Sequence, residues 1–383
     1  MTKGSEFPMT TAIVTTTINV PEFLDGYCKD AAQHGRKDLC FIIVADHKTP
    51  PQAQSYCENL QKSYGFPMEY FGVERQRKYL ERFPELDEYL PWNSVQRRNM
   101  GMVYAYEIGC ETILTVDDDN YLLEPDLLRA HLRVGTKAKL KSYSSPDGWM
   151  NPCQFLNVTP ALRTYHRGFP VSKRFVDTKL KEGTRTGRVV VNVGMWLGDP
   201  DVDAWIRMSV PLEATEWTAR EDFVLGPETW APFNSQQTAV ARDVLPAYFL
   251  NPNAGRYDDI WGSYVLHRIA NHMGDLISYG SPIVSHLQKR SLASLWRDME
   301  DERMGTLLTD QFVTVLRAAK LSGKLYEECY AQISEAIVRW AKDGRLSSAE
   351  QAYLQEYARG INVWLTTFGR LSKSSVPSAE LVR

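Results

Sequence analysis

Two apolar strands with a helix between them occupy the first 45 residues, and they constrain the fold more than any other feature. Residues 12–19 (AIVTTTIN) and 39–45 (LCFIIVA) are short and rich in β-branched side chains. Residues 21–33 have the pattern of a helix with a proline near its first turn. A strand–helix–strand unit of this length joins parallel strands, so we predict an α/β fold with a Rossmann-like, mostly parallel central sheet.

The middle of the chain extends this pattern. Ser94 can cap a helix that runs to about residue 108, and residues 112–116 (TILTV) form the next predicted buried strand. Residues 71–92 are charged and aromatic, which predicts a partly helical excursion over the sheet. Residues 140–187 are rich in turns and basic side chains, which predicts loops around a cleft. Further strands are predicted at 189–193, 240–249 and 276–284.

The C-terminal part has helical periodicity, with predicted helices at 295–321, 325–342 and 348–371. Ser347 and Glu350 form a capping-box pattern before the last of them. We therefore predict four parts: a vector-derived leader at 1–8, an α/β catalytic domain at 9–292, a helical annex at 293–372, and a disordered or vector-derived tail at 373–383.

Composition excludes several classes of protein. The 383 residues carry a net charge of −3, which does not favour nucleic acid as a partner. No apolar run reaches the length of a membrane span, so we expect no membrane partner. The six cysteines form no Cys-x-x-Cys pair and no zinc spacing, which indicates buried free thiols and a cytoplasmic location.

Three consecutive carboxylates, Asp117, Asp118 and Asp119, follow the predicted strand at 112–116. Adjacent carboxylates repel one another, so burying them together is costly unless a cation compensates. At the carboxyl end of a parallel strand they would face the ligand crevice, where Mg²⁺ or Mn²⁺ would bind them and the oxygens of a diphosphate. The alternative is a solvated acidic turn, because an Asp-x-Asp motif is weak by itself.

Two arginines, Arg97 and Arg98, stand near the start of the helix before that strand. Arginines at a helix N-terminus can hold phosphate oxygens together with the free backbone N–H groups. The alternative is a solvated basic face of the helix.

Three further segments carry candidate side chains. Asp258 and Asp259 open an apolar helix, where one carboxylate could act as a general base or bind sugar hydroxyls, or where both simply favour the helix start. His286 ends a predicted strand and is either a third metal ligand or structural. Arg167 precedes Gly168-Phe169-Pro170, which by itself indicates a structural turn with an ordinary arginine.

Taken together, these segments resemble the reversibly glycosylated polypeptide family, the plant UDP-arabinopyranose mutases. RGFPVSKR at 167–174 is similar to the family's RGYPFS segment, and TVDDDN at 115–120 is similar to its IDDDC. Three more segments resemble the family in the same order: NVGMWLGDPDVDAW at 192–205, GRYDDIWGSYVLHRIANHMG at 255–274 and SPIVSHLQKRS at 281–291. The resemblance extends over roughly residues 10 to 340.

The resemblance implies a GT-A glycosyltransferase fold with a C-terminal helical annex, a UDP-sugar substrate, and a Mn²⁺ or Mg²⁺ ion. The implied metal ligands are Asp117, Asp119 and His286. Arg167 becomes the implied site of self-glycosylation, with Asp258 and Asp259 as the implied sugar-facing acids. We place five residues at the substrate: Asp46, Arg97, Arg98, Asp118 and Trp196.

The implied activity is that of a UDP-sugar mutase, or of an enzyme that glycosylates itself at Arg167. The chain differs from the family by a long insertion at 73–98 and by Asn120, where the family has cysteine. Two alternatives stay open: a glycosyltransferase that moves the sugar to a small-molecule, glycan or nucleotide acceptor, and a non-catalytic nucleotide-sugar-binding subunit. The annex helices offer a surface for a homo-oligomer.

Overall fold

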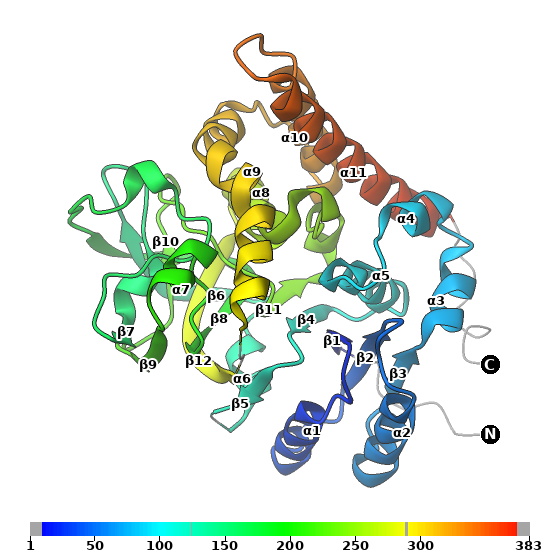
Figure 1. Cartoon of the computed structure of the whole chain (residues 1–383). Helices are drawn as coiled ribbons and strands as arrows, with labels where there is room; N and C mark the ends of the chain where they lie inside the picture. Colours follow the sequence, from blue (N-terminus) through cyan, green and yellow to red (C-terminus); the bar gives the residue numbers. More distant parts are fainter. Residues whose placement is uncertain (1–9, 124, 288–289, 374–383) are drawn as a thin grey trace.

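The computed structural model describes residues 10–123, 125–287 and 290–373, and its N-terminal part is a parallel half-sheet (Figure 1). β1 (Thr11–Thr17) pairs in parallel with β2 (Leu39–Ala45) and β4 (Thr112–Val116), and β2 pairs with β3 (Met68–Phe71). The crossovers between these strands contain α1 (Phe23–Gln33), α2 (Gln52–Tyr64) and α5 (Arg98–Glu107). The carboxyl ends of β1, β2 and β4 therefore meet at one edge of the sheet, where ligands bind in folds of this kind.

The other half of the sheet is mixed. Its strands are β5 (Asn120–Leu122), β6 (Lys137–Ser144), β7 (Leu156–Thr159), β8 (Lys181–Gly198), β9 (Glu213–Trp217), β10 (Phe223–Leu225), β11 (Gln237–Ala241) and β12 (Leu276–His286). Within the described residues the strand order is β3-β2-β1-β4-β11-β8-β6-β10-β12-β5, and β12 also pairs with β8. β11 is antiparallel to both β4 and β8 and joins the two halves.

The remaining helices cover the sheet and the site. They are α3 (Val73–Leu80), α4 (Pro84–Tyr89), α6 (Leu127–His131), α7 (Ala204–Ser209), α8 (Asp258–Met273), α9 (Leu292–Ala318), α10 (Tyr326–Trp340) and α11 (Ser348–Lys373). Helix α11 lies beside α10 and reaches α4, while α9 contacts α7 and the 3₁₀ segment Pro252–Tyr257 that leads into α8 (Figure 1). Helix α9 thereby contacts the 3₁₀ segment that contributes Gly255 and Arg256 to the cleft at the strand ends.

Gly101 sets the close approach of α5 to the sheet. A Cβ atom at this position would lie 2.7 Å from Val14 Cγ1 and 2.9 Å from Val44 Cγ2. Real side chains do not tolerate such distances, so glycine allows the helix to rest directly on β1 and β2. This packing brings Arg98, the first residue of α5, to the strand ends.

Most of the predicted elements are confirmed, with two corrections. The α/β fold with a parallel half-sheet and helices at the C-terminus is present, and Ser347 and Glu350 make the predicted capping box. The loops predicted at 140–187 are wrong in part, because β6, β7 and the start of β8 fall there; the exposed first half of β8 is polar on both faces and lacks an alternating pattern. The strand predicted at 240–249 ends at Ala241, and a 3₁₀ segment containing Pro246 follows.

The predicted leader at 1–8 lies outside the described residues, as does the predicted tail, apart from Lys373 at the end of α11. Side chains of α9, α10 and α11 belong to the same hydrophobic core as the sheet. The division into two domains at residue 292 stays a prediction.

None of the described helices has the length and apolar character needed to cross a membrane. All six cysteines are buried free thiols, as predicted.

Candidate active site

A polar cleft of about 330 Å³ opens at the carboxyl ends of β1, β2 and β4. Its volume lies within the range of small-molecule sites. Side chains from widely separated parts of the chain line it, including Asp46, Arg98, Asp117, Asp118, Asp119, Arg167, Asp201, Asn234, Arg256, Asp258, Asp259, His286 and Arg290. Nine of the eleven predicted site residues line this cleft. The cleft therefore gathers the segments that resemble the family.

The first two carboxylates after β4 have partners within the protein. Asp117 forms an ion pair with the buried Arg98, whose guanidinium also donates to the Ser235 carbonyl at 3.0 Å. Asp118 accepts a hydrogen bond from the Thr17 hydroxyl at 2.7 Å. Burial raises the pKa of Asp118, and the Thr17 hydrogen bond opposes this rise.

The third carboxylate, Asp119, has one oxygen engaged and one oxygen free. Its Oδ2 lies 3.1 Å from His286 Nε2, whereas Oδ1 is buried and has no hydrogen-bond partner among the described residues. Burial would raise the pKa of Asp119, but the hydrogen bond and charge of His286 together lower it. A buried carboxylate oxygen without a donor is costly, which makes this oxygen a candidate cation ligand.

His286 is oriented by a second hydrogen bond. Its Nδ1 donates to the Asp199 carbonyl at 2.8 Å, which leaves Nε2 directed at Asp119. This orientation is typical of histidines that bind metals through Nε2. Across the described ranges, however, no group of three His, Cys, Asp or Glu side chains is assembled around one point. Asp119 and His286 fit a divalent cation, while Asp117 is held by Arg98.

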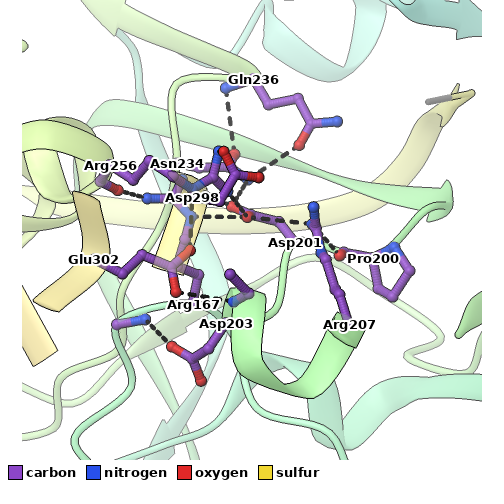
Figure 2. A network of polar contacts seen from close by, with 12 residues as sticks. Arg167, Pro200, Asp201, Asp203, Arg207, Asn234, Gln236, Arg256, Asp298 and Glu302 are labelled. Atoms are coloured by element: carbon purple, nitrogen blue, oxygen red, sulfur yellow. Dashed lines mark hydrogen bonds and ion pairs between the residues drawn. The ribbon is translucent and has the colours of Figure 1, made fainter. Parts of the chain in front are cut away.

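Arg167 lies in a buried network of charges next to the cleft, as Figure 2 shows. Its guanidinium donates to Asp201 at 2.8 and 3.1 Å, to Asp259 at 3.2 Å, and to the Arg256 carbonyl. Burial alone would lower the pKa of Arg167, but the charges of Asp201 and Asp259 raise it well above its ordinary value. Each nitrogen of the Arg167 guanidinium thus donates at least one hydrogen bond in this arrangement.

The two acids at the start of α8 differ in environment. Asp259 accepts hydrogen bonds from Arg167 and from the Ser235 backbone N–H at 2.9 Å. Asp258 accepts one from the Gln96 amide at 2.7 Å and has no ion pair among the described residues. Burial, followed by the negative charge of Asp259, raises the pKa of Asp258 to about 7. A carboxyl group with this pKa can gain or lose a proton near neutral pH.

Asp298 and Glu302 of helix α9 bind two arginines that line the cleft. Arg290 donates to Asp298 at 2.8 Å and to Asp199 at 3.0 Å. Arg256 donates to Glu302 at 3.0 Å and lies 3.6 Å from Asp298. Both arginines line the cleft. The acids of α9 therefore fix the positions of two guanidinium groups there.

Two predicted substrate-binding residues are not brought to the cleft. Arg97 is fully buried, where it donates to Gln76 at 3.0 Å and to the Leu90 carbonyl at 3.2 Å, with Trp92 over its guanidinium. Trp196 is also fully buried, on the core strand β8. Neighbouring side chains of a helix point in different directions, and those of a strand alternate between the two faces of the sheet. These two side chains therefore face the core and not the cleft.

Asp46, by contrast, lines the cleft at the end of β2 and accepts a hydrogen bond from the Ser94 backbone N–H at 3.3 Å.

Several cleft residues were missed by the sequence analysis. Asp201 lies within the family-like segment at 192–205 and could have been found there, as Arg256 could in the segment at 255–274. Asn234, which donates to Asp201 at 2.7 Å, and Gln96, which donates to Asp258, have no motif of their own. Their roles depend on contacts between distant segments.

The parallel half-sheet, the acidic triplet after β4 and the cleft at the strand ends define an α/β fold with a small-molecule cleft at the carboxyl ends of its parallel strands. The chain is also similar in sequence to curated proteins. The chain is 24% identical to UDP-arabinopyranose mutase 2 of Arabidopsis thaliana, over 68% of this chain and 69% of the relative. It is 23% identical to UDP-arabinopyranose mutase 1 of the same plant, over 54% of this chain and 55% of the relative. The resemblance stated from the motifs is therefore confirmed.

No family model matches the chain. Among solved structures, a mannosyltransferase from Pyrobaculum calidifontis, in complex with GDP-Man and Mn²⁺, aligns with 13% identity and a TM-score of 0.38, over 96% of this chain and 86% of that one.

Proposed function

We propose that the chain is a metal-dependent enzyme of the reversibly glycosylated polypeptide type that acts on a UDP-sugar. The observation that carries this proposal is Asp119 Oδ1, a buried carboxylate oxygen without a hydrogen-bond partner in the described structure, next to the oriented His286. The names of the curated relatives, UDP-arabinopyranose mutases, support a UDP-sugar as the substrate.

Asp119, His286 and Asp117 are the residues that would hold Mn²⁺ or Mg²⁺. Such an ion would stabilise the negative charge on the leaving nucleoside diphosphate. Asp117 would have to be shared between the ion and Arg98, its present partner. The preference of hard cations for carboxylate oxygens supports this set of ligands.

The chain's own side chains suit the other parts of a nucleotide sugar. Arg256 and Arg290 supply two guanidinium groups at the cleft, and guanidinium groups bind phosphate oxygens well. Asp46 stands at the end of β2, where a ribose hydroxyl could donate to it. Asp258, Asp259 and Asp201 supply acceptors for sugar hydroxyls near Arg167.

For self-glycosylation, an Arg167 nitrogen would form a bond to the anomeric carbon while the bond from that carbon to the diphosphate oxygen breaks. The proton lost from the guanidinium would pass to Asp259 or Asp201, which already accept its hydrogen bonds. The raised pKa of Arg167 opposes this transfer, because the nitrogen lone pair becomes available only after deprotonation.

The second candidate function is transfer of the sugar to a separate acceptor. The pKa of Asp258, about 7, favours it, because this carboxylate could remove the proton from an incoming hydroxyl. Arg167 would then orient Asp259 and Asp201 rather than attack the sugar. A cytoplasmic location and a homo-oligomer formed through α9, α10 and α11 stay predictions.

The test is mass spectrometry of the purified chain after incubation with Mn²⁺ and a panel of UDP-sugars, with free UDP measured in parallel. A hexose or pentose adduct on the Arg167 peptide, absent from the Arg167→Lys variant and retained in Arg188→Lys, is the expected result. Arg188 pairs with Asp243 on the surface and is the matched control. An acceptor-dependent release of UDP without an adduct would favour the second function. No release of UDP from any UDP-sugar, with or without an acceptor extract, would refute both.

A further inference from the structure

A second cavity, of about 380 Å³, borders the segment that carries Arg167. Thr164, Tyr165 and Phe169 line this second cavity, whereas Arg167 lines the active-site cleft. One short stretch of chain therefore forms part of the wall of both. None of the predicted site residues lines the second cavity, and the proposed function does not use it.

The wall of the second cavity is held in place by Asn151. Its amide donates to the Thr164 carbonyl at 2.7 Å, and its Oδ1 accepts hydrogen bonds from the Cys153 and His166 backbone N–H groups at 3.2 and 3.4 Å. The cavity is therefore lined by a cross-braced segment, which favours a site formed before a ligand arrives.

Thr164 carries an unused polar group at this wall. Its side chain is 5% exposed, and its Oγ1 is buried without a hydrogen-bond partner in the part of the chain that the structure describes. A buried hydroxyl without a partner costs free energy, because it has lost its hydrogen bonds to water. A ligand that hydrogen-bonds to Thr164 Oγ1 would remove this cost.

Aromatic rings form one side of the cavity. Trp149 and Phe169 have ring centroids 5.8 Å apart, and Phe169 and Tyr165 have centroids 5.3 Å apart, so the three rings make one cluster. All three are less than 10% exposed and line the cavity. Rigid aromatic side chains offer large contact area with little loss of conformational entropy.

The polar lining decides between classes of ligand. Asp147, Gln154 and Thr178 line the same cavity, so the lining is partly polar and suits a molecule with hydroxyl groups better than a purely apolar one. Asp147 also disfavours an anion, because the hydrogen bonds from Ser145 and Thr178 lower its pKa against the effect of burial and keep it ionised. Two cations line the cavity as well: Arg163 pairs with Asp177 at 2.9 Å, and the charge of Lys173 helps to lower the pKa of Asp147, so the charges of the lining already have counterparts.

We propose that the second cavity is a binding site for a small, uncharged, polyhydroxylated molecule of monosaccharide size, which hydrogen-bonds to Thr164 Oγ1 and packs on the cluster of Trp149, Tyr165 and Phe169. The site is separate from the active-site cleft, and the proposal does not depend on the proposed function.

The experiment is saturation-transfer NMR on the full chain, with L-arabinose and D-glucose as probes. We expect saturable binding of at least one of them, with a dissociation constant of about 10 mM or lower. Thr164→Val keeps the shape of the side chain and removes the hydroxyl, so it should weaken binding about tenfold. Leu162→Trp adds bulk at an exposed position of the lining and should abolish binding.

Two controls separate this cavity from the rest of the molecule. Leu132→Trp makes the same change at an exposed leucine outside both cavities and should leave monosaccharide binding intact. Asp258→Asn alters the active-site cleft and should also leave it intact. The proposal is overturned if neither sugar binds saturably, if Leu162→Trp binds as well as Leu132→Trp does, or if UDP with Mn²⁺ displaces the sugar. Thermal melts of the Val and Trp variants show that a loss of binding is not a loss of folding.

Discussion

Arg167 Nε lies 2.8 Å from Asp201 Oδ1, and both side chains are at least nine-tenths buried. Asp201 also accepts a hydrogen bond from Asn234 at 2.7 Å, and Arg207 and Arg256 approach it within 4.0 Å (Figure 2). Removing charges from water is costly, so a buried pair persists where further hydrogen bonds satisfy its remaining atoms. This network holds Arg167 against Asp259 at the edge of the cleft.

Replacement of Asp201 by asparagine should strongly destabilise the chain. The shape of the side chain stays, but the buried Arg167 loses one of its two carboxylate partners and keeps only Asp259, which should cost up to about 3–5 kcal/mol of unfolding free energy. Urea denaturation of Asp201→Asn measures this loss. The matched control is Glu335→Gln, which breaks an exposed ion pair with Arg339 and should leave the midpoint almost unchanged. A similar midpoint for the two variants would contradict the prediction.

The glycines of α5 and α1 should respond in opposite directions to alanine. Gly101→Ala places a methyl group against Val14 and Val44 and should cost about 1–3 kcal/mol of stability, because α5 must move away from the sheet. Gly26 in α1 has open space around it, and Gly26→Ala should add up to about 1 kcal/mol through helix propensity. Thermal denaturation of both variants checks the signs. A Gly101→Ala variant as stable as the unmodified chain would show that α5 does not need this close approach.

The sequence predicts the parallel half of the fold well, because local signals specify it. Apolar runs, a proline near a helix start and the capping serine Ser94 each act within a few residues, and Ser94 does accept a hydrogen bond from the Gln96 backbone. The first half of β8 is different. Its exposed Lys181–Gly187 portion pairs antiparallel with β6 and owes its strand form to that partner, which no local pattern reveals.

The residues of the candidate site are likewise predicted only in part by local sequence. The acidic triplet stands out because it follows a buried strand, and its place at the cleft follows from the direction of that strand. Arg97 and Arg98 look equivalent in the sequence, yet one lies in the core and the other at Asp117, since neighbouring residues of a helix point about 100° apart. The partner of each arginine, Gln76 or Asp117, is fixed only by tertiary packing.

Asp119→Asn should weaken the metal-dependent part of UDP binding. Oδ1 of Asp119 is the buried oxygen without a partner, and asparagine has lower affinity for a hard cation at this position. With Mn²⁺ present, we expect UDP affinity by calorimetry to fall about tenfold or more, while affinity in EDTA stays the same as that of the unmodified chain. Asp126→Asn, which alters an aspartate bound to Arg36 far from the cleft, is the control and should change neither value. Equal losses with and without Mn²⁺ would remove Asp119 from the set of metal ligands.

Asp258 should make activity and stability depend on pH in opposite directions. Burial and the charge of Asp259 raise its pKa from 3.8 to about 7, so the folded chain favours the protonated carboxyl group. The folded state therefore binds more protons than the unfolded state between these two values, and the free energy of unfolding should fall as pH rises through this window. A general base must be deprotonated, so kcat/KM for sugar transfer should instead rise through about pH 7.

The variant Asp258→Asn isolates both effects, because it keeps the hydrogen bond with Gln96 within reach and removes the titration. Between about pH 4 and 7, the free energy of unfolding should fall less steeply with pH in this variant than in the unmodified chain. Its residual kcat/KM should no longer rise near pH 7. Denaturation curves and initial rates over one pH series measure the two together. If the activity rise persists in Asp258→Asn while the stability difference disappears, Asp258 titrates in the fold but another group removes the proton from the acceptor.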